Sequence, residues 1–238
     1  MNKKFLTAIA VLAVAMFLVQ YRMPHRFSWE ESFDGASHQP FGCLVLDSLL
    51  SASLPQGYST TGQTPWQLYH DKRGPRALIV NSSSQTDQPL MQMAREGWHI
   101  LLLMDGYCDL LTDSLSDDYS LEYAFSYKNV VEGEPELGRI RWVGRGDGHA
   151  EGGRTYAVLP QLVGSHIERS GGKGRSLAQY LDENQDDWVD IAVSYPIGRG
   201  EIVVLSAPLL MTNYGVLNDE CRPIVERLIG RLGPMPVV

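Results

Sequence analysis

The chain opens with a long apolar run, and this run sets the first constraint on what the chain can fold into. Residues 5–19 are apolar except for Thr7. A helix that crosses a membrane needs roughly 20 apolar residues, while the core of a secretory signal needs roughly 7–15. Addition of Gln20-Tyr21 and of a snorkelling Lys4 gives a short but usable span. We therefore predict an N-terminal transmembrane helix, with the anchor over residues 1–21.

A cleaved signal is the alternative, and the residues around the run argue against it. Ala13 and Ala15 have the spacing of a cleavage site but lie inside the apolar run, and residues 16–19 make a poor polar segment. Lys3-Lys4 before the run predicts a cytoplasmic amino end, although Arg22 and Arg26 behind it oppose this orientation. The expected location is the inner (cytoplasmic) membrane, single-pass, with a periplasmic or otherwise extracytoplasmic domain. Residues 22–40 would form the stalk.

The charge of the remaining chain is strongly acidic. Four of the 20 basic residues lie in or beside the apolar run, so the other 16 face 28 acidic residues, a balance of −12. A domain this acidic is a poor ligand for nucleic acid or for anionic lipid headgroups. We expect no nucleic-acid partner, and solubility is the simplest role of the acid excess.

Few residues have the spacing of a metal or cofactor site. The chain has three scattered cysteines without a C-x-x-C motif, and its six histidines form no H-x-x-x-H pair. Residues 182–187 have the D-x-N-x-D spacing of a calcium loop, but Asp187 replaces the glycine at position 6 and Val193 the glutamate at position 12. We predict no metal and no cofactor.

Apolar runs alternate with helical patterns along the rest of the chain. A continuous apolar run is typical of a parallel strand that is covered on both faces, and helical spacing indicates the layers that cover it. The predicted helices lie at 41–50, 66–69, 87–96, 176–181 and 219–232, and the predicted buried strands at 77–80, 98–104, 189–195 and 201–207. This alternation predicts an α/β fold with three layers.

A segment with a different pattern interrupts this alternation. Tyr119, Leu121, Tyr123, Phe125 and Tyr127 alternate with polar or small residues, as in a half-exposed strand. We therefore predict an antiparallel insertion over about 105–175 within an α/β domain at 41–233. A short tail, 234–238, follows.

Several short segments resemble a known bacterial family. They are Pro40–Cys43 leading into Leu49-Leu50, the runs Ala77–Val80 and Gly97–Met104, the stretch Pro196–Val204, and Pro208–Leu210 with Thr212–Tyr214. In these segments the chain resembles domain of unknown function 4350, a family of uncharacterised membrane-anchored proteins. The resemblance implies a flavodoxin-like sandwich similar to class I glutamine amidotransferases. It also implies a neighbourhood of other membrane proteins and MoxR-type ATPases as partners.

A glutamine-amidotransferase nucleophile needs a thiol on a sharp, glycine-flanked turn between a strand and a helix. Cys108 follows the predicted strand 98–104, and Gly106 fits that turn, but Leu110 stands where the second glycine is needed. The neighbouring Asp109 would raise the pKa of the thiol, and no histidine follows His166. We therefore assign no catalytic residue and regard Cys108 as a weak nucleophile candidate.

Three residues are candidates for ligand binding because they follow predicted strands. Asn213 and Tyr214 come after the strand at 201–207, and Asp105 comes directly after the strand at 98–104. Open α/β sheets bind ligands at the carboxyl ends of their strands. A structural role explains Asn213 and Tyr214 equally directly, because asparagine shapes turns and tyrosine closes cores.

Two functions remain open at this point. The first is a non-catalytic, membrane-tethered module that binds a protein partner or a small ligand. The second is a hydrolase or amidotransferase-like enzyme with a degenerate site. Because no nucleophile, base and orienting group assemble in the sequence, the first is favoured.

Overall fold

The protein divides into two units, residues 1–30 and 31–238, which are described separately. The computed structural model describes residues 3–22, 27–71, 74–81, 88–104, 115, 121–125, 137–144, 154–169, 172–182 and 187–238.

The first unit holds one helix, α1, over Lys3–Arg22. In the described part of the chain, no helix is both long enough and apolar enough to cross a membrane. The apolar run at residues 5–19 is about 22 Å long as a helix, against a hydrocarbon core of roughly 30 Å. This finding corrects two predictions, the N-terminal transmembrane helix and the single-pass location in the inner membrane with a periplasmic domain.

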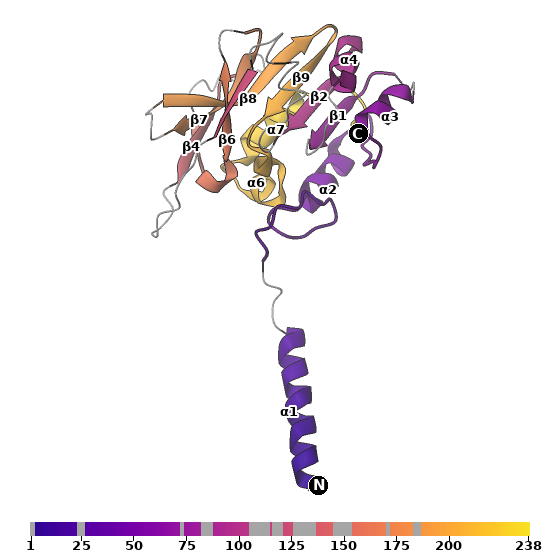
Figure 1. Ribbon diagram of the computed structural model, residues 1–238, viewed down its shortest axis with the longest axis vertical. Coiled ribbons are helices and arrows are strands. Elements are labelled where there is room, and N and C mark those ends of the chain that lie inside the picture. Colours follow the sequence, from indigo (N-terminus) through magenta and orange to yellow (C-terminus); the bar gives the residue numbers. More distant parts are fainter. Residues whose placement is uncertain are drawn as a thin grey trace. The chain divides into compact units, whose positions relative to one another are not determined.

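The second unit is built on a mixed nine-stranded sheet that curves like a half-barrel (Figure 1). Its main path runs β1-β2-β9-β8-β7-β4-β5, while β3 pairs with β6, and β6 also pairs with β8. Among the named strands in the described residues, β1 pairs with β2 and β2 with β9 in parallel, and the other strand pairs are antiparallel. The strands are β1 (Ala77–Asn81), β2 (His99–Leu103), β3 (Leu121–Phe125), β4 (Gly138–Trp142), β5 (Thr155–Val158), β6 (Ser165–Arg169), β7 (Arg175–Asp182), β8 (Asp187–Ile197) and β9 (Gly200–Leu205).

The helices of this unit are short. They are α2 (Leu44–Ser53), α3 (Pro65–His70), α4 (Gln88–Glu96), α6 (Asn213–Leu217) and α7 (Arg222–Gly230), with 3-10 turns at Pro160–Leu162 and Pro208–Met211. The predicted helix at 87–96 is confirmed as α4, which ends before Gly97, a residue with a φ of 109°. A positive φ is the conformation that glycine adopts most readily after a helix.

The parallel strands carry a core on both faces. Leu101 of β2 lies between Ile79 and Val203 in register, and it is fully buried. Leu101 and Leu103 share a buried cluster with side chains of α2 and α7, whereas Ile100 and Leu102 share a second cluster with α3 and α4. The continuous apolar run of β2 thus correctly predicted a strand that is covered on both sides.

The predicted flavodoxin-like, amidotransferase-like sandwich is wrong. Helices lie on both faces of the parallel strands β1, β2 and β9, but this three-layer arrangement does not extend over the rest of the sheet. A flavodoxin-like sheet is parallel throughout, whereas β8 and β9 form an antiparallel hairpin around Gly198-Arg199-Gly200. The predicted turn between these two strands is confirmed. The antiparallel strands expected within about 105–175 pair into the same sheet as the rest.

The predicted helix at 176–181 is wrong, since these residues belong to β7. The pairing of β7 with β8 shifts register on both sides of Ala178, as in a β-bulge. Leu177, Ala178, Tyr180 and Leu181 are all buried as a result. A bulged strand can therefore bury neighbouring residues in the spacing of a helix, which explains the error.

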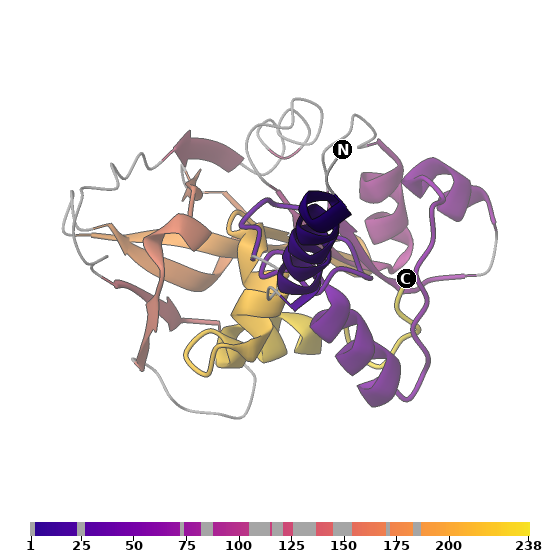
Figure 2. The same cartoon turned by 90° about the horizontal axis from the view of Figure 1, so that it is seen from below.

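The C-terminal residues lie beside the violet segment that follows α2 (Figure 2). Val237 forms parallel bridges with Tyr58 and Ala77. The Val238 backbone N–H donates to the Ala77 carbonyl at 3.0 Å, and the Ile79 N–H donates to the Val238 carbonyl at 2.9 Å. The C-terminal residues thus lie between the segment with Tyr58 and β1.

Candidate functional site

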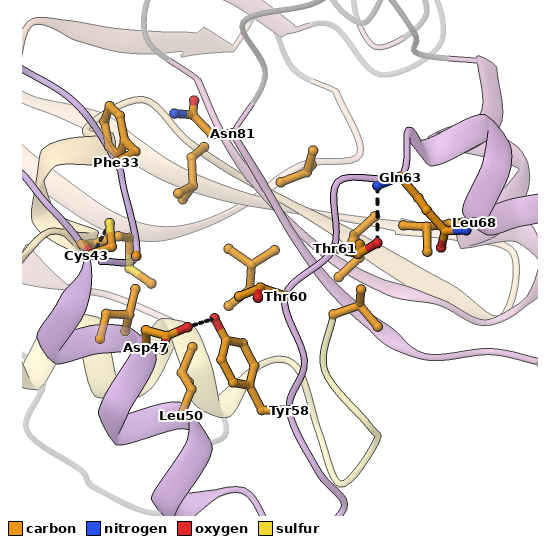
Figure 3. Close-up of a pocket in the computed structure, with 18 of the residues that line it drawn as sticks. Phe33, Cys43, Asp47, Leu50, Tyr58, Thr60, Thr61, Gln63, Leu68 and Asn81 are labelled. Carbon is orange, nitrogen blue, oxygen red and sulfur yellow. Dashed lines mark hydrogen bonds between the residues drawn. The ribbon is translucent and has the colours of Figure 1, made fainter. Parts of the chain in front are cut away.

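A cavity of about 350 Å³ lies at the carboxyl ends of β1 and β2 (Figure 3). Its walls come from α2, from the segment at 58–65, and from the last residues of the two strands, Asn81 and Leu103. This is the edge of a parallel sheet at which α/β proteins place their ligands. Its volume lies within the range of about 300–1,000 Å³ that is typical of small-molecule sites.

One face of α2 supplies the apolar wall. Leu46 and Leu50, four residues apart, are buried on this face and line the cavity, while Ser48 and Leu49 point to solvent. This follows from the helical period, which places residues i and i+4 on the same side. Met211, in the 3-10 turn after β9, also lines the cavity.

Asp47 and Tyr58 form the polar centre of the cavity (Figure 3). Asp47 lies in the first turn of α2, where the helix dipole favours a negative charge. The Tyr58 hydroxyl donates a hydrogen bond to Asp47 Oδ1 at 2.9 Å. Burial, and then the hydrogen bond to Asp47, raise the pKa of the Tyr58 phenol. Tyr58 therefore stays protonated and acts as a donor at neutral pH.

Cys43 lies at the N-cap of α2 and also lines the cavity. Its Sγ is 3.8 Å from the Met211 carbonyl oxygen, to which the thiol donates. Burial, followed by the charges of Asp34 and Asp47, raises the pKa of the Cys43 thiol from 9.0 to about 11. At neutral pH the thiol is protonated and is a poor nucleophile.

Phe33 closes another side of the cavity with a strained backbone. Its φ is 48°, and it is the one non-glycine residue with positive φ in the part of the chain that the structure describes. The Phe33 N–H donates to the Phe41 carbonyl at 3.1 Å, which helps hold this conformation. A bulky residue in the left-handed region costs of order 1–3 kcal/mol, and such strain is concentrated at ligand sites and clamps.

The mouth of the cavity is polar and exposed. Thr60, Thr61 and Gln63 line it and face solvent. The Gln63 N–H donates to Thr61 Oγ1 at 3.1 Å, which shapes the loop. Immediately after it, Thr64 and Gln67 form a capping box that starts α3. A capped helix therefore fixes one end of the mouth.

Comparison with known proteins gives one family. The model of domain of unknown function DUF4350 matches residues 35–229. The chain belongs to the DUF4350 family. No curated protein matches it. The DUF4350 match includes every residue that lines the cavity except Phe33 and the C-terminal Val238.

The solved structures that are similar to this DUF4350 protein are distant. They include Gan42B, a GH42 β-galactosidase from G. stearothermophilus, with 13% identity, a TM-score of 0.42, and coverage of 68% of this chain and 22% of that one. A cytoplasmic protein of Salmonella typhimurium LT2 has 9% identity and a TM-score of 0.38, with coverage of 75% and 78%. The chain thus spans about a fifth of the β-galactosidase that it matches. At TM-scores below 0.5 these likenesses carry no functional argument.

Asn213 lies outside the cavity and is buried. Its Nδ2 donates to the carbonyls of Ser37 and Gln39, both at 2.8 Å, and its Oδ1 accepts from the Val45 N–H at 2.8 Å. These bonds fix the segment that leads into α2 and so position Cys43 and Asp47. They favour the structural role of Asn213, while its role in binding stays a prediction.

The remaining predicted residues are placed differently. Tyr214 is half-buried and packs against the buried cluster that includes Leu46 and Leu50 of α2. Its backbone N–H donates to the Pro40 carbonyl at 2.9 Å. Asp105 and the weak nucleophile candidate Cys108 lie outside the described residues. In the described ranges no group of three or more His, Cys, Asp and Glu side chains is placed to hold a metal ion.

Sequence reasoning missed Asp47, Tyr58 and Phe33. One signal was available, because Asp47 is a carboxylate directly beside the apolar helical face formed by Leu46 and Leu50. An acid in such a position is expected either at a helix start or in a site.

Proposed function

We propose that this DUF4350 protein is a non-catalytic module that binds a small molecule in the cavity between α2 and the segment at 58–65. The observation that carries the proposal is a cavity of about 350 Å³ with apolar walls around the hydrogen-bonded Asp47–Tyr58 pair. Small-molecule sites typically combine mostly apolar walls with a few convergent polar groups. The position at the carboxyl ends of parallel strands agrees with this use.

The chemistry of the cavity supports binding over catalysis. A cysteine hydrolase or amidotransferase needs a thiolate and a base that is oriented by a third group. Burial and two carboxylates keep the Cys43 thiol protonated, and no histidine is among the described residues that line the cavity. The hydrolase or amidotransferase-like alternative therefore has no specific support here. Association with a MoxR-type ATPase, implied by the family resemblance, stays an untested prediction.

A variant that blocks the mouth tests this function without disturbing the core. Thr60 lines the cavity and is exposed, so Thr60→Trp would fill the mouth with an indole ring. Ser59 is its exposed neighbour and is not part of the cavity, so Ser59→Trp is the matched control. Tyr58 and Thr60 line the cavity while Ser59 between them does not, which keeps the two changes separate.

The readout is saturation-transfer NMR with a fragment library that contains neutral, cationic and anionic compounds. We expect a set of fragments to bind the full chain and the Ser59→Trp variant, and to lose most of that binding in Thr60→Trp. The proposal fails if no fragment of any charge binds, or if the fragments that bind do so equally in both variants.

A further inference from the structure

Asp47 carries the side-chain charge of the cavity. Among the described residues that line it, Asp47 is the only side chain charged at neutral pH, since Cys43 and Tyr58 hold their protons. No lysine, arginine or histidine is in this set. Asp34 adds to the negative field, because it acts on the Cys43 thiol. A ligand anion would therefore meet no compensating charge.

Asp47 keeps an acceptor for a ligand. Tyr58 donates to Oδ1, while Oδ2 has no hydrogen bond in the described part of the chain. The segment that carries Phe33 passes directly over this carboxylate, since a Cβ at Gly35 would lie 3.7 Å from Oδ1. A carboxylate in a mostly apolar cavity gains most from a charged donor, because charge-assisted hydrogen bonds are about twice as strong as neutral ones.

The walls define the rest of the ligand. Leu46, Leu50 and Leu103 are buried and apolar, and Phe33 adds an aromatic ring. An aromatic face attracts a cation, and the leucines favour an apolar body. A bare metal ion suits this set poorly, because hard cations require several oxygen ligands.

Building on the proposed binding function, we infer that the cavity selects a small organic ammonium ion with an apolar body, whose N–H groups donate to Asp47. The Tyr58 hydroxyl orients the carboxylate from one side. The apolar body lies among the leucines of α2 and β2. Phe33 closes over the ligand from the segment before α2.

Three probes of similar shape and different charge test this selectivity on the full chain. They are 2-phenylethylammonium, 3-phenylpropionamide and 3-phenylpropionate, titrated by isothermal calorimetry at low and at physiological salt. We expect the ammonium to bind roughly tenfold to hundredfold more tightly than the amide, as for a hydrogen bond to a charged group. The carboxylate should bind most weakly.

Two substitutions separate a local charge effect from the net charge of −8. Asp47→Asn keeps an oxygen for Tyr58 but removes the charge, and it should abolish the preference for the ammonium over the amide. Glu226→Gln removes one exposed charge on α7 and should leave that preference unchanged.

The inference is overturned if the ammonium and the amide bind wild-type protein equally, or if Glu226→Gln changes the preference as much as Asp47→Asn. Failure of all three probes also overturns it. The proposed binding function survives each of these results if other fragments still bind in a way that Thr60→Trp blocks. The comparison of probes on wild-type protein needs no variant, so it decides the inference even if Asp47→Asn does not fold.

Discussion

The side-chain oxygen of Asn213 accepts a hydrogen bond from the backbone N–H of Val45 at 2.8 Å, across 168 positions of sequence. Through this contact the segment after β9 positions the start of α2, and with it Asp47. The candidate site therefore depends on a residue that does not line it.

Replacement of Asn213 should destabilise the protein strongly. Asn213→Ala leaves the Val45 N–H and the Ser37 carbonyl without their Asn213 partner, and it removes one of the hydrogen bonds to the Gln39 carbonyl, which also accepts from the Gly42 N–H. Each buried polar group that loses its partner costs about 1–3 kcal/mol, so we expect a loss of at least about 2 kcal/mol in the free energy of unfolding. Chemical denaturation measures this loss. A change smaller than about 0.5 kcal/mol, the range of ordinary surface substitutions, would rule out the structural role of Asn213.

The ion pair between Glu201 and Arg231 should contribute more than surface pairs do. Arg231 Nη2 lies 2.6 Å from Glu201 Oε2, and Arg231 Nε lies 3.1 Å from Oε1, with side chains 26% and 13% exposed for Arg231 and Glu201. Arg231→Ala would leave a mostly buried carboxylate unpaired, at a cost of about 2 kcal/mol, between the values for exposed and fully buried pairs.

Arg222 provides the control for that experiment. It pairs with Asp219 and Glu226 on the surface, with its side chain 50% exposed. Arg222→Ala should cost less than about 0.5 kcal/mol because water screens such pairs. Equal losses in unfolding free energy for the two variants would contradict the special role of the Glu201–Arg231 pair.

Alkaline pH should weaken the folded state. Burial is the main cause that raises the pKa of Cys43 and of Cys221 from 9.0 to about 11. A raised pKa means that the folded state holds the thiol proton more tightly than the unfolded state. This stabilisation is complete below pH 9 and is lost as the pH rises toward 11.

We therefore expect the free energy of unfolding to fall between pH 9 and pH 11 in denaturant titrations. The fall should be smaller in Cys43→Ala/Cys221→Ala, where the raised pKa of Tyr58 still contributes. A wild-type stability that is constant over this pH range would show that neither thiol is perturbed as described.

Replacement by alanine should have opposite effects on stability at two glycines, Gly200 and Gly62. A Cβ at Gly200, at the start of β9, would overlap the carbonyl oxygen of Trp98, whereas nothing lies within 4 Å of a Cβ at Gly62. Gly200→Ala should lower the melting temperature by several degrees, since the backbone between α4 and β2 must move. Gly62→Ala should be neutral or slightly stabilising, because alanine restricts the unfolded chain. A tolerated Gly200→Ala would contradict the close packing of the β8–β9 hairpin.

The sequence predicts local elements well where capping and breaking residues mark them. The helix α4 has Pro89 in its first turn and Gly97 after its end, and β2 is one continuous apolar run. The helix predicted at 176–181 failed because the bulges beside Ala178 hide the alternation of a strand. The transmembrane prediction failed because a run of this length lies at the lower limit of a span.

The cavity was beyond sequence reasoning for a different reason. Phe33, Asp47, Tyr58, Leu103 and Met211 come from five separate segments of the chain. Their convergence depends on long-range contacts, such as the bonds of Asn213 to the segment before α2. No local pattern encodes these contacts. That the strand ends of the sheet hold a site stays a prediction, and the residues that line the cavity there were not predicted.

The proposed binding site is tested most directly by the position at which a bound small molecule perturbs the protein. Methyl NMR spectra of full-length protein with labelled leucines would be recorded during a titration with 2-phenylethylammonium and with 3-phenylpropionamide. We expect saturable shifts at Leu46, Leu50 and Leu103, which line the cavity, and none at the exposed Leu137 and Leu217. Shifts confined to Leu137 and Leu217, or no saturable shift at the three cavity leucines with either compound, would contradict the proposed site.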